Sequence, residues 1–110
     1  MSELTLVTGG AGFVGKHLVA KLRARGERVR SFDLVKPEHK DDVQGTVTDM
    51  DAVVGAMDGV STVFHLAGNA QLWSRNSSQF DRVNRFGTKC IVEGALNAGV
   101  RRLIHCSSLT

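Results

Sequence analysis

Short apolar runs alternate with longer stretches of helical spacing along most of the chain. The run at residues 4–7 is short and β-rich, and it is stopped by Gly9 and Gly10, as expected for a strand buried on both faces. Helical spacing begins at Phe13 and ends before Gly26. The face of this helix that we predict to be buried carries Val14, Leu18 and Leu22. The chain is therefore predicted to open with a strand, a glycine-rich turn and a helix.

Four further strands and two further helices are predicted from the same patterns. The strands lie at residues 28–33, 43–47, 61–66 and 102–106, and a short helix lies at 51–57. A long helix begins at Asn76 or Ser77 and ends at Gly99. Its predicted buried stripe consists of Phe80, Val83, Gly87, Ile91, Ala95 and Ala98. Residues 34–42 are too few for a helical crossover, so we expect an extended loop there.

Strands that alternate with helices predict an α/β fold built on a doubly wound parallel sheet. In such a sheet, ligands bind beyond the carboxyl ends of the strands, near the point where the strand order reverses. The segments that follow strands 4–7, 28–33, 61–66 and 102–106 are therefore the candidate functional segments.

Composition narrows the class of protein. The 110 residues suffice for one modest domain, and 42% hydrophobic with 23% charged residues is typical of a globular chain. The net charge is only +3 and the basic residues are scattered, so we predict no nucleic-acid partner. No apolar run has membrane-spanning length and no leader precedes the first strand, so we expect no membrane partner and a cytoplasmic location. Cys90 and Cys106 are isolated from each other and from any histidine cluster, which disfavours a metal site.

The residues from Thr8 to Gly15 carry the most specific chemical signal. They match both Gly-x-Gly-x-x-Gly and Thr-Gly-x-x-Gly-x-x-Gly, directly between a predicted strand and a predicted helix. Glycine permits the backbone conformation of the turn and the close approach of a pyrophosphate, while the helix N-terminus offers N–H groups to the phosphates. The segment predicts a dinucleotide-binding turn, and a purely structural turn is the alternative.

A nucleoside-triphosphate-binding loop is the chemical rival. Gly10, Gly15 and Lys16 match the start of that motif, which continues with a Ser or Thr that binds Mg²⁺. Here the next residue is His17, which has no hydroxyl group. The pattern therefore favours a dinucleotide over a triphosphate.

Asp33 ends the second predicted strand, 18 positions after Gly15. A carboxylate at this place accepts hydrogen bonds from an adenosine ribose, and its charge would repel a 2′-phosphate. We therefore predict NAD as the cofactor. Lys36 nearby leaves NADP open as the second choice, and a local turn around Asp33 is the structural alternative.

These motifs resemble the extended short-chain dehydrogenases/reductases, which include NAD-dependent epimerases and dehydratases, dihydroflavonol-type reductases and hydroxysteroid dehydrogenase/isomerases. The similarity covers essentially the whole chain. Beyond the glycine motif it includes Gly45-Thr46-Val47-Thr48-Asp49, His65-Leu66-Ala67-Gly68, Val83-Asn84-Arg85-Phe86-Gly87-Thr88 and Ser107-Ser108. Thr46 departs from the family, which often has Asp there. The resemblance implies the N-terminal five-strand portion of a Rossmann-type sheet, with strand order 3-2-1-4-5.

The resemblance also implies which residues would surround NAD. The pyrophosphate would lie near Gly9, Gly12, Phe13, Val14 and Gly15, the adenosine ribose near Asp33 and Leu34, and the adenine near Asp49 and Met50. The rest of the cofactor would lie near Leu66, Ala67, Gly68, Asn84, Cys106 and Ser107. Asp49 equally fits a helix N-cap, Asn84 an exposed helix position and Cys106 a buried strand residue. Trp73 would border the substrate or anchor its own loop.

The family's catalytic set is a Ser or Thr after the fifth strand and a Tyr-x-x-x-Lys on the next helix, where the Tyr acts as acid/base and the Lys lowers its pKa. Ser108 matches the first of these positions, but the chain contains no tyrosine. We expect residues 1–110 to be an incomplete NAD(P)-binding domain that lacks the substrate domain and is inactive alone.

The parent enzyme would be an NAD-dependent epimerase, dehydratase or reductase that acts on a sugar nucleotide or a similar alcohol or carbonyl. A non-catalytic module that binds a dinucleotide or a partner protein is the alternative. The fifth strand would be an exposed sheet edge, which favours self-association.

Overall fold

The computed structural model of the chain describes residues 3–10, 13–37, 39–66 and 77–105. Within these ranges the chain alternates between strands and helices, as predicted. The elements are β1 (Leu4–Thr8), α1 (Phe13–Ala24), β2 (Arg28–Asp33), β3 (Val43–Gln44), α2 (Met50–Ala56), β4 (Val60–His65), α3 (Ser77–Ala98) and β5 (Arg102–His105). None of the described helices is both long and apolar enough to cross a membrane.

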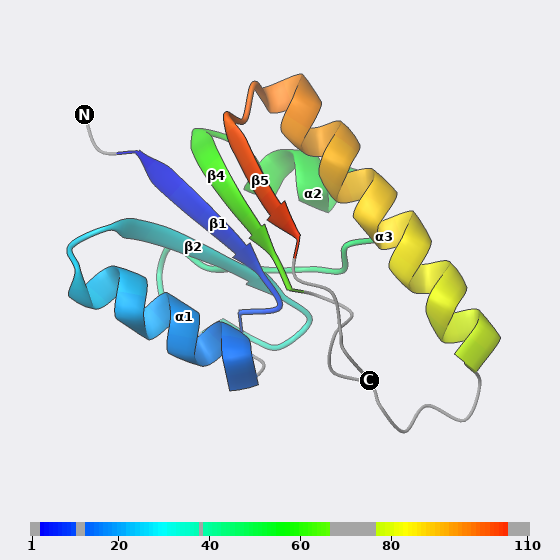
Figure 1. Cartoon of the computed structure of the whole chain (residues 1–110), viewed down its shortest axis with the longest axis horizontal. Helices are drawn as coiled ribbons and strands as arrows, with labels where there is room; N and C mark the ends of the chain where they lie inside the picture. Colours follow the sequence, from blue (N-terminus) through cyan, green and yellow to red (C-terminus); the bar gives the residue numbers. More distant parts are fainter. Residues whose placement is uncertain (1–2, 11–12, 38, 67–76, 106–110) are drawn as a thin grey trace.

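The strands form one sheet in the order β3-β2-β1-β4-β5, and all neighbouring pairs are parallel. The chain moves outward from β1 to β3, returns to β4 beside β1, and continues to β5, so the strand order reverses between β1 and β4. The strand arrows in Figure 1 point to one common edge of the sheet, where α1 begins. The predicted fold class and strand order are confirmed.

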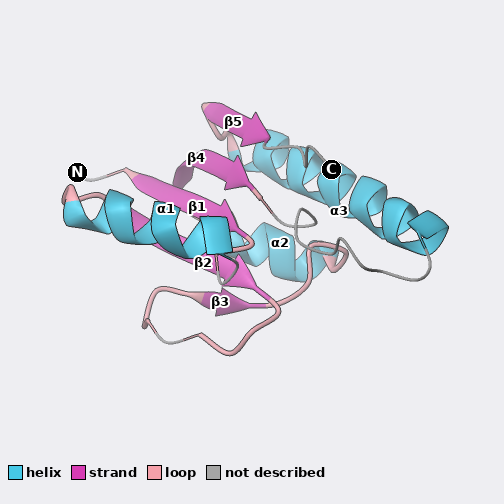
Figure 2. Ribbon diagram, turned by 60° about the horizontal axis from the view of Figure 1, so that its bottom comes forward, coloured by secondary structure: helices cyan, strands magenta, loops and turns pink. Residues whose placement is uncertain are grey.

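The helices cover the two faces of the sheet unequally. α2 and α3 lie on one face, and α1 lies on the other (Figure 2). The larger hydrophobic cluster joins α2 and α3 to the sheet through Leu4, Leu6, Phe32, Val53, Ala56, Met57, Val60, Val63, Cys90, Ile91 and Ala95. The smaller cluster joins α1 to the sheet through Val7, Val19, Leu22, Val29 and Leu66. Alternation along β1 supplies both clusters, because successive side chains point to opposite faces.

α3 packs closely on the segment after β3 and on α2. A Cβ atom at Gly87 would overlap the side chain of Val47, and one at Gly94 would press against Val53 of α2. The predicted place of Gly87 in the buried stripe of this helix is confirmed. This close contact orients α3 relative to the sheet.

The link between β2 and β3 contains no helix among its described residues, as predicted. Near its end, the carboxylate of Asp42 accepts hydrogen bonds from Arg23 Nη2 at 2.8 Å and from the Ser31 backbone N–H at 3.0 Å. Arg23 also donates to the Val29 carbonyl at 3.0 Å. Asp42 therefore ties the link to both α1 and β2.

Three details of the predicted packing were wrong. Val14 is 64% exposed, and the buried positions of α1 are Gly15, Val19 and Leu22, because the helix meets the sheet only after its first residues. Ala98 is exposed near the end of α3, whereas Cys90 and Gly94 join its buried stripe. The third strand pairs only at Val43–Gln44, because the chain then turns and Val47 packs on α3 instead.

Candidate functional site

The glycine turn leaves β1 at the edge to which the strands point. Gly9 has a φ of 76°, a conformation that a residue with a Cβ rarely adopts. Its N–H donates to the Phe32 carbonyl of β2 at 2.9 Å. The turn is therefore anchored to β2 at the point where that strand ends.

Two further glycines bring three elements into close contact around this turn. A Cβ atom at Gly10 would overlap the Ser31 side chain of β2, and one at Gly15 would overlap the Gly9 carbonyl. α1 consequently begins directly against the turn, and its first N–H groups have no partners within the helix. The partial positive charge of a helix N-terminus is therefore located beside the end of β1.

Asp33 lies next to this turn, because it follows the residue whose carbonyl binds Gly9. One carboxylate oxygen, Oδ1, accepts from the Val35 N–H at 3.3 Å, so Asp33 also forms the local turn named as its structural alternative. Leu34 is 67% exposed, and its carbonyl accepts a hydrogen bond from Gln44 Nε2 at 2.9 Å. The structure thus brings Asp33, Leu34 and the glycine turn to one edge of the sheet.

Asp49 and Met50 both have structural roles. Asp49 is the N-cap of α2, since its Oδ1 accepts from the N–H groups of Asp51 at 3.1 Å and Ala52 at 3.3 Å. Met50 is partly buried and packs against the larger cluster. The N-cap alternative for Asp49 is confirmed, and contact of either residue with adenine stays a prediction.

Sequence reasoning did not find a buried polar cluster at the ends of β1 and β4. His65 is 2% exposed, and its Nδ1 and Nε2 lie 2.7 Å from Thr8 Oγ1 and 3.1 Å from Thr88 Oγ1. Its ring lies against the His105 ring, with centroids 5.1 Å apart. Burial, and to a smaller degree His105, lower the pKa of His65 from 6.5 to about 4. Polar residues at the ends of apolar strands were the signal that could have revealed this cluster.

Only some of the remaining predicted site residues have side chains that the structure describes. Phe13 and Val14 are exposed at the start of α1, and Leu66 is buried directly after β4. Asn84 belongs to α3, but its side chain is not among those described. The predictions for Gly12, Ala67, Gly68, Trp73, Cys106, Ser107 and Ser108 lie outside the described residues. In the described part of the chain, no three His, Cys, Asp or Glu side chains gather as a metal site would require.

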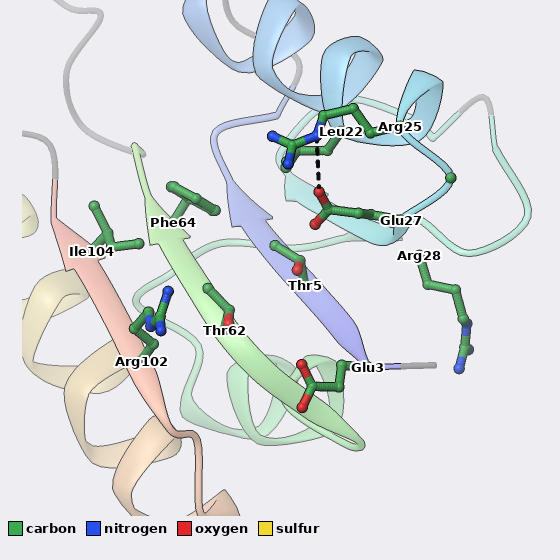
Figure 3. Close-up of a pocket in the computed structure, with 11 residues that line it drawn as sticks. Glu3, Thr5, Leu22, Arg25, Glu27, Arg28, Thr62, Phe64, Arg102 and Ile104 are labelled. Carbon is green, nitrogen blue, oxygen red and sulfur yellow. Dashed lines mark ion pairs between the residues drawn. The ribbon is translucent and has the colours of Figure 1, made fainter. Parts of the chain in front are cut away.

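A groove of about 530 Å³ lies elsewhere, on the α1 face of the sheet (Figure 3). Phe64, Ile104 and Leu22 give it an apolar lining, and Arg25 and Glu27 form an ion pair at 3.6 Å on its border. None of the predicted site residues that the structure describes lines this groove. The glycine turn is the better candidate site, because its residues have specific chemistry, whereas the groove is a part of the sheet that α1 covers only partly.

Comparison with known proteins shows the family of the chain. The family model of the 3-beta hydroxysteroid dehydrogenase/isomerase family matches residues 6–110. The chain belongs to this family. Its relatives include a 3 beta-hydroxysteroid dehydrogenase/Delta 5→4-isomerase of Mycobacterium tuberculosis, 40% identical over 94% of the chain and 31% of that protein. They also include a mouse sterol-4-alpha-carboxylate 3-dehydrogenase, decarboxylating, 41% identical over 93% of the chain and 29% of that protein.

Solved structures of short-chain dehydrogenase/reductase proteins share the fold of this family member. One, from Agrobacterium tumefaciens and with bound NAD, superposes with a TM-score of 0.83 at 39% identity, covering 94% of the chain and 32% of that structure. The UDP-glucose 4-epimerase of Thermotoga maritima with UDP-glucose superposes with a TM-score of 0.81 at 28% identity, covering 93% of the chain and 37% of that structure. The chain thus spans roughly a third of the length of these proteins.

Proposed function

We propose that the chain binds a nicotinamide dinucleotide at the carboxyl edge of its sheet. The observation that carries this proposal is the joint placement of the glycine turn and Asp33, linked through the hydrogen bond from Gly9 N–H to the Phe32 carbonyl. Backbone N–H groups of the turn and of the first turn of α1 would bind the pyrophosphate. The Asp33 carboxylate would accept from the ribose hydroxyls, and its distance from the turn follows from the pairing of β1 with β2.

The residues at this edge fit NAD better than NADP. A 2′-phosphate would meet the negative charge of Asp33, whereas a ribose hydroxyl would donate to it. The Agrobacterium relative was solved with bound NAD, as was a 28% identical uronate dehydrogenase variant from the same organism. When bound, nicotinamide supplies a carbon that accepts or donates hydride. Leu34, Asp49 and Met50 are the neighbours that we propose for the adenosine part.

We further propose that residues 1–110 are the NAD(P)-binding portion of a longer dehydrogenase, epimerase or dehydratase that acts on an alcohol or carbonyl group. The relatives that match the chain are named for steroid, sterol and sugar substrates. The third of their length that they share with the chain therefore does not distinguish between these substrate classes. The chain has no tyrosine to act as the family's acid/base, and Ser108 is its one match to the catalytic set. We expect the purified chain to bind the dinucleotide without turnover.

Calorimetry with NAD, NADP and ATP tests the proposal. The wild-type chain should bind NAD more tightly than NADP, and Asp33→Ala should weaken NAD about tenfold, because it removes a charge-assisted hydrogen bond. Asp58→Ala is the matched control, since Asp58 is an exposed acid in the turn before β4. Tighter binding of NADP than of NAD by the wild type would contradict the NAD assignment. If the chain bound ATP with Mg²⁺ and neither NAD nor NADP, the alternative of a nucleoside-triphosphate-binding loop would be supported.

We also propose that β5 mediates self-association. It is the edge strand of the described sheet, and Leu103 is 37% exposed. An edge strand with an exposed apolar side chain offers backbone groups and apolar area to a second copy. Sedimentation velocity should show a concentration-dependent oligomer that Leu103→Lys reduces, and a monomer at all concentrations would contradict the proposal.

A further inference from the structure

Thr8, His65 and Thr88 form a hydrogen-bonded chain across three elements, and the proposed binding of the dinucleotide makes no direct use of it. His65 Nδ1 is 2.7 Å from Thr8 Oγ1 of β1, and His65 Nε2 is 3.1 Å from Thr88 Oγ1 of α3. A hydroxyl group can donate or accept, so a neutral imidazole satisfies both contacts with either nitrogen protonated. The imidazole therefore links β1 and α3 through β4.

The link continues into the backbone of the candidate site. The Leu66 N–H is shared between the carbonyl oxygen and the hydroxyl oxygen of Thr8, each at 3.1 Å. Thr8 is also the residue before Gly9, whose N–H is bound by β2. The orientation of the Thr8 hydroxyl thus affects both the start of the glycine turn and the first residue after β4.

Three apolar side chains could fill the same space without the free-energy cost of burying polar groups. Burial of polar groups is unfavourable unless each finds a partner, and among the described residues no buried side-chain nitrogen or oxygen lacks one. Hydrogen bonds are directional, whereas apolar contacts are not. The three polar side chains therefore restrict the rotation of α3 about its axis and the sliding of β1 and β4 along each other.

We propose that His65 is a positioning residue of the dinucleotide site. Through Thr8 and Thr88 it couples the orientation of α3 to the geometry of the glycine turn and of the β4 end. This inference rests on the proposed function, because the edge that it orders is the one that would receive the dinucleotide. His65 does not touch the ligand in this proposal and acts through its two hydroxyl partners.

Removal of the Thr88 hydroxyl tests the coupling at its far end. Thr88→Val keeps the size of the side chain and removes the partner of His65 Nε2, so NAD binding should weaken about tenfold while the chain stays folded. Thr88→Ser restores a hydroxyl and should bind NAD within about twofold of wild type. Thr62→Val is the matched control, because Thr62 is a partly buried threonine of β4 that lines the groove away from this edge. It should leave NAD binding unchanged.

Two measurements on the ligand-free chain report on the coupling directly. In Thr88→Val, the imidazole ¹⁵N chemical shifts of His65 should change, and the Leu66 amide should exchange with solvent about tenfold faster. Neither should change in Thr62→Val. A role confined to packing would lower the urea midpoint of Thr88→Val and leave the Leu66 amide and the NAD dissociation constant as in wild type.

The outcomes separate this inference from the proposed function. If wild type binds NAD and Thr88→Val binds it equally well, the positioning role is wrong and the proposed function stands. If wild type does not bind NAD, the proposed function fails, and the assignment of His65 to a dinucleotide site fails with it even if the Leu66 amide responds. Weakened binding in Thr88→Val with recovery in Thr88→Ser supports both.

Discussion

The two faces of the sheet are built differently. On the face covered by α2 and α3, side chains such as Leu6, Val53 and Ile91 are fully buried in one continuous cluster. On the other face, α1 covers the strands at one side of the sheet, and the groove of Figure 3 leaves Phe64 and Ile104 only partly buried. The difference indicates that one face supplies most of the stability, whereas the carboxyl edge shared by both faces carries the candidate site.

The largest effect should come from the well-packed face. Ile91→Ala removes a side chain with 0% exposure between α2, α3 and the sheet, and we expect a loss of about 4 kcal/mol of unfolding free energy. Urea denaturation measures it. Leu96→Ala on the same helix is the control, since Leu96 is 75% exposed, and it should change stability by less than about 0.5 kcal/mol. Equal losses in the two variants would contradict the described packing of α3.

The same number of carbon atoms removed from the α1 face should matter less. Leu22→Ala affects the smaller cluster and lies beside the groove, where water and neighbouring side chains can relax into the space. We expect a loss of about 2 kcal/mol, roughly half that of Ile91→Ala under the same urea conditions. A loss as large as that of Ile91→Ala would show that the two faces contribute alike.

Acid should weaken the well-packed face through His65. Its pKa is lowered from 6.5 to about 4 in the folded chain, so the unfolded chain binds more protons between these pH values. The contribution of His65 to the free energy of unfolding is therefore fully present above pH 6.5. It is lost as the pH falls toward 4, and the slope approaches about 1.4 kcal/mol per pH unit. His65→Gln should remove this contribution. The urea midpoints of the wild type and of His65→Gln are measured from pH 7 to pH 5. If they fell in parallel, the assignment of this pH dependence to His65 would be contradicted.

The smallest effect should come from the floor of the groove. Ile104→Thr keeps a β-branched side chain at a partly buried position of β5, and it should change the unfolding free energy by about 0.5 kcal/mol. Thermal denaturation followed by circular dichroism is sufficient to detect a larger change. A loss above that of Leu22→Ala would mean that the groove is covered in solution, for example by a second copy.

Prediction from the sequence worked best where the signal was local. The strand at Arg28–Asp33 was predicted with its observed bounds, and the glycine turn was predicted between its strand and its helix. Gly26 and Gly99 follow their helices with positive φ values, as expected for helix ends. The placement of Asp33 beside the turn also followed, because strand–turn–helix–strand order constrains which strand ends meet.

Prediction was weaker where packing between distant segments decides. Val14 has a helical position that matches a buried face, but it precedes the part of α1 that contacts the sheet. Val47 falls in the third predicted strand, yet it packs on Gly87 of α3. Periodicity describes which residues share a face and does not describe what, if anything, covers that face.

Backbone freedom at glycine, the period of apolar residues and the charge of Asp33 are properties of short segments, and they were enough to indicate the fold class and the edge where a dinucleotide would bind. The partners of His65 are of another kind. Thr8 is 57 positions away along the chain and Thr88 is 23, so no local pattern links the three residues. Folding brings them together because parallel strands align their ends and because α3 is packed against the sheet. Burial at that meeting point then lowers the pKa of the imidazole, a property that an isolated histidine does not have.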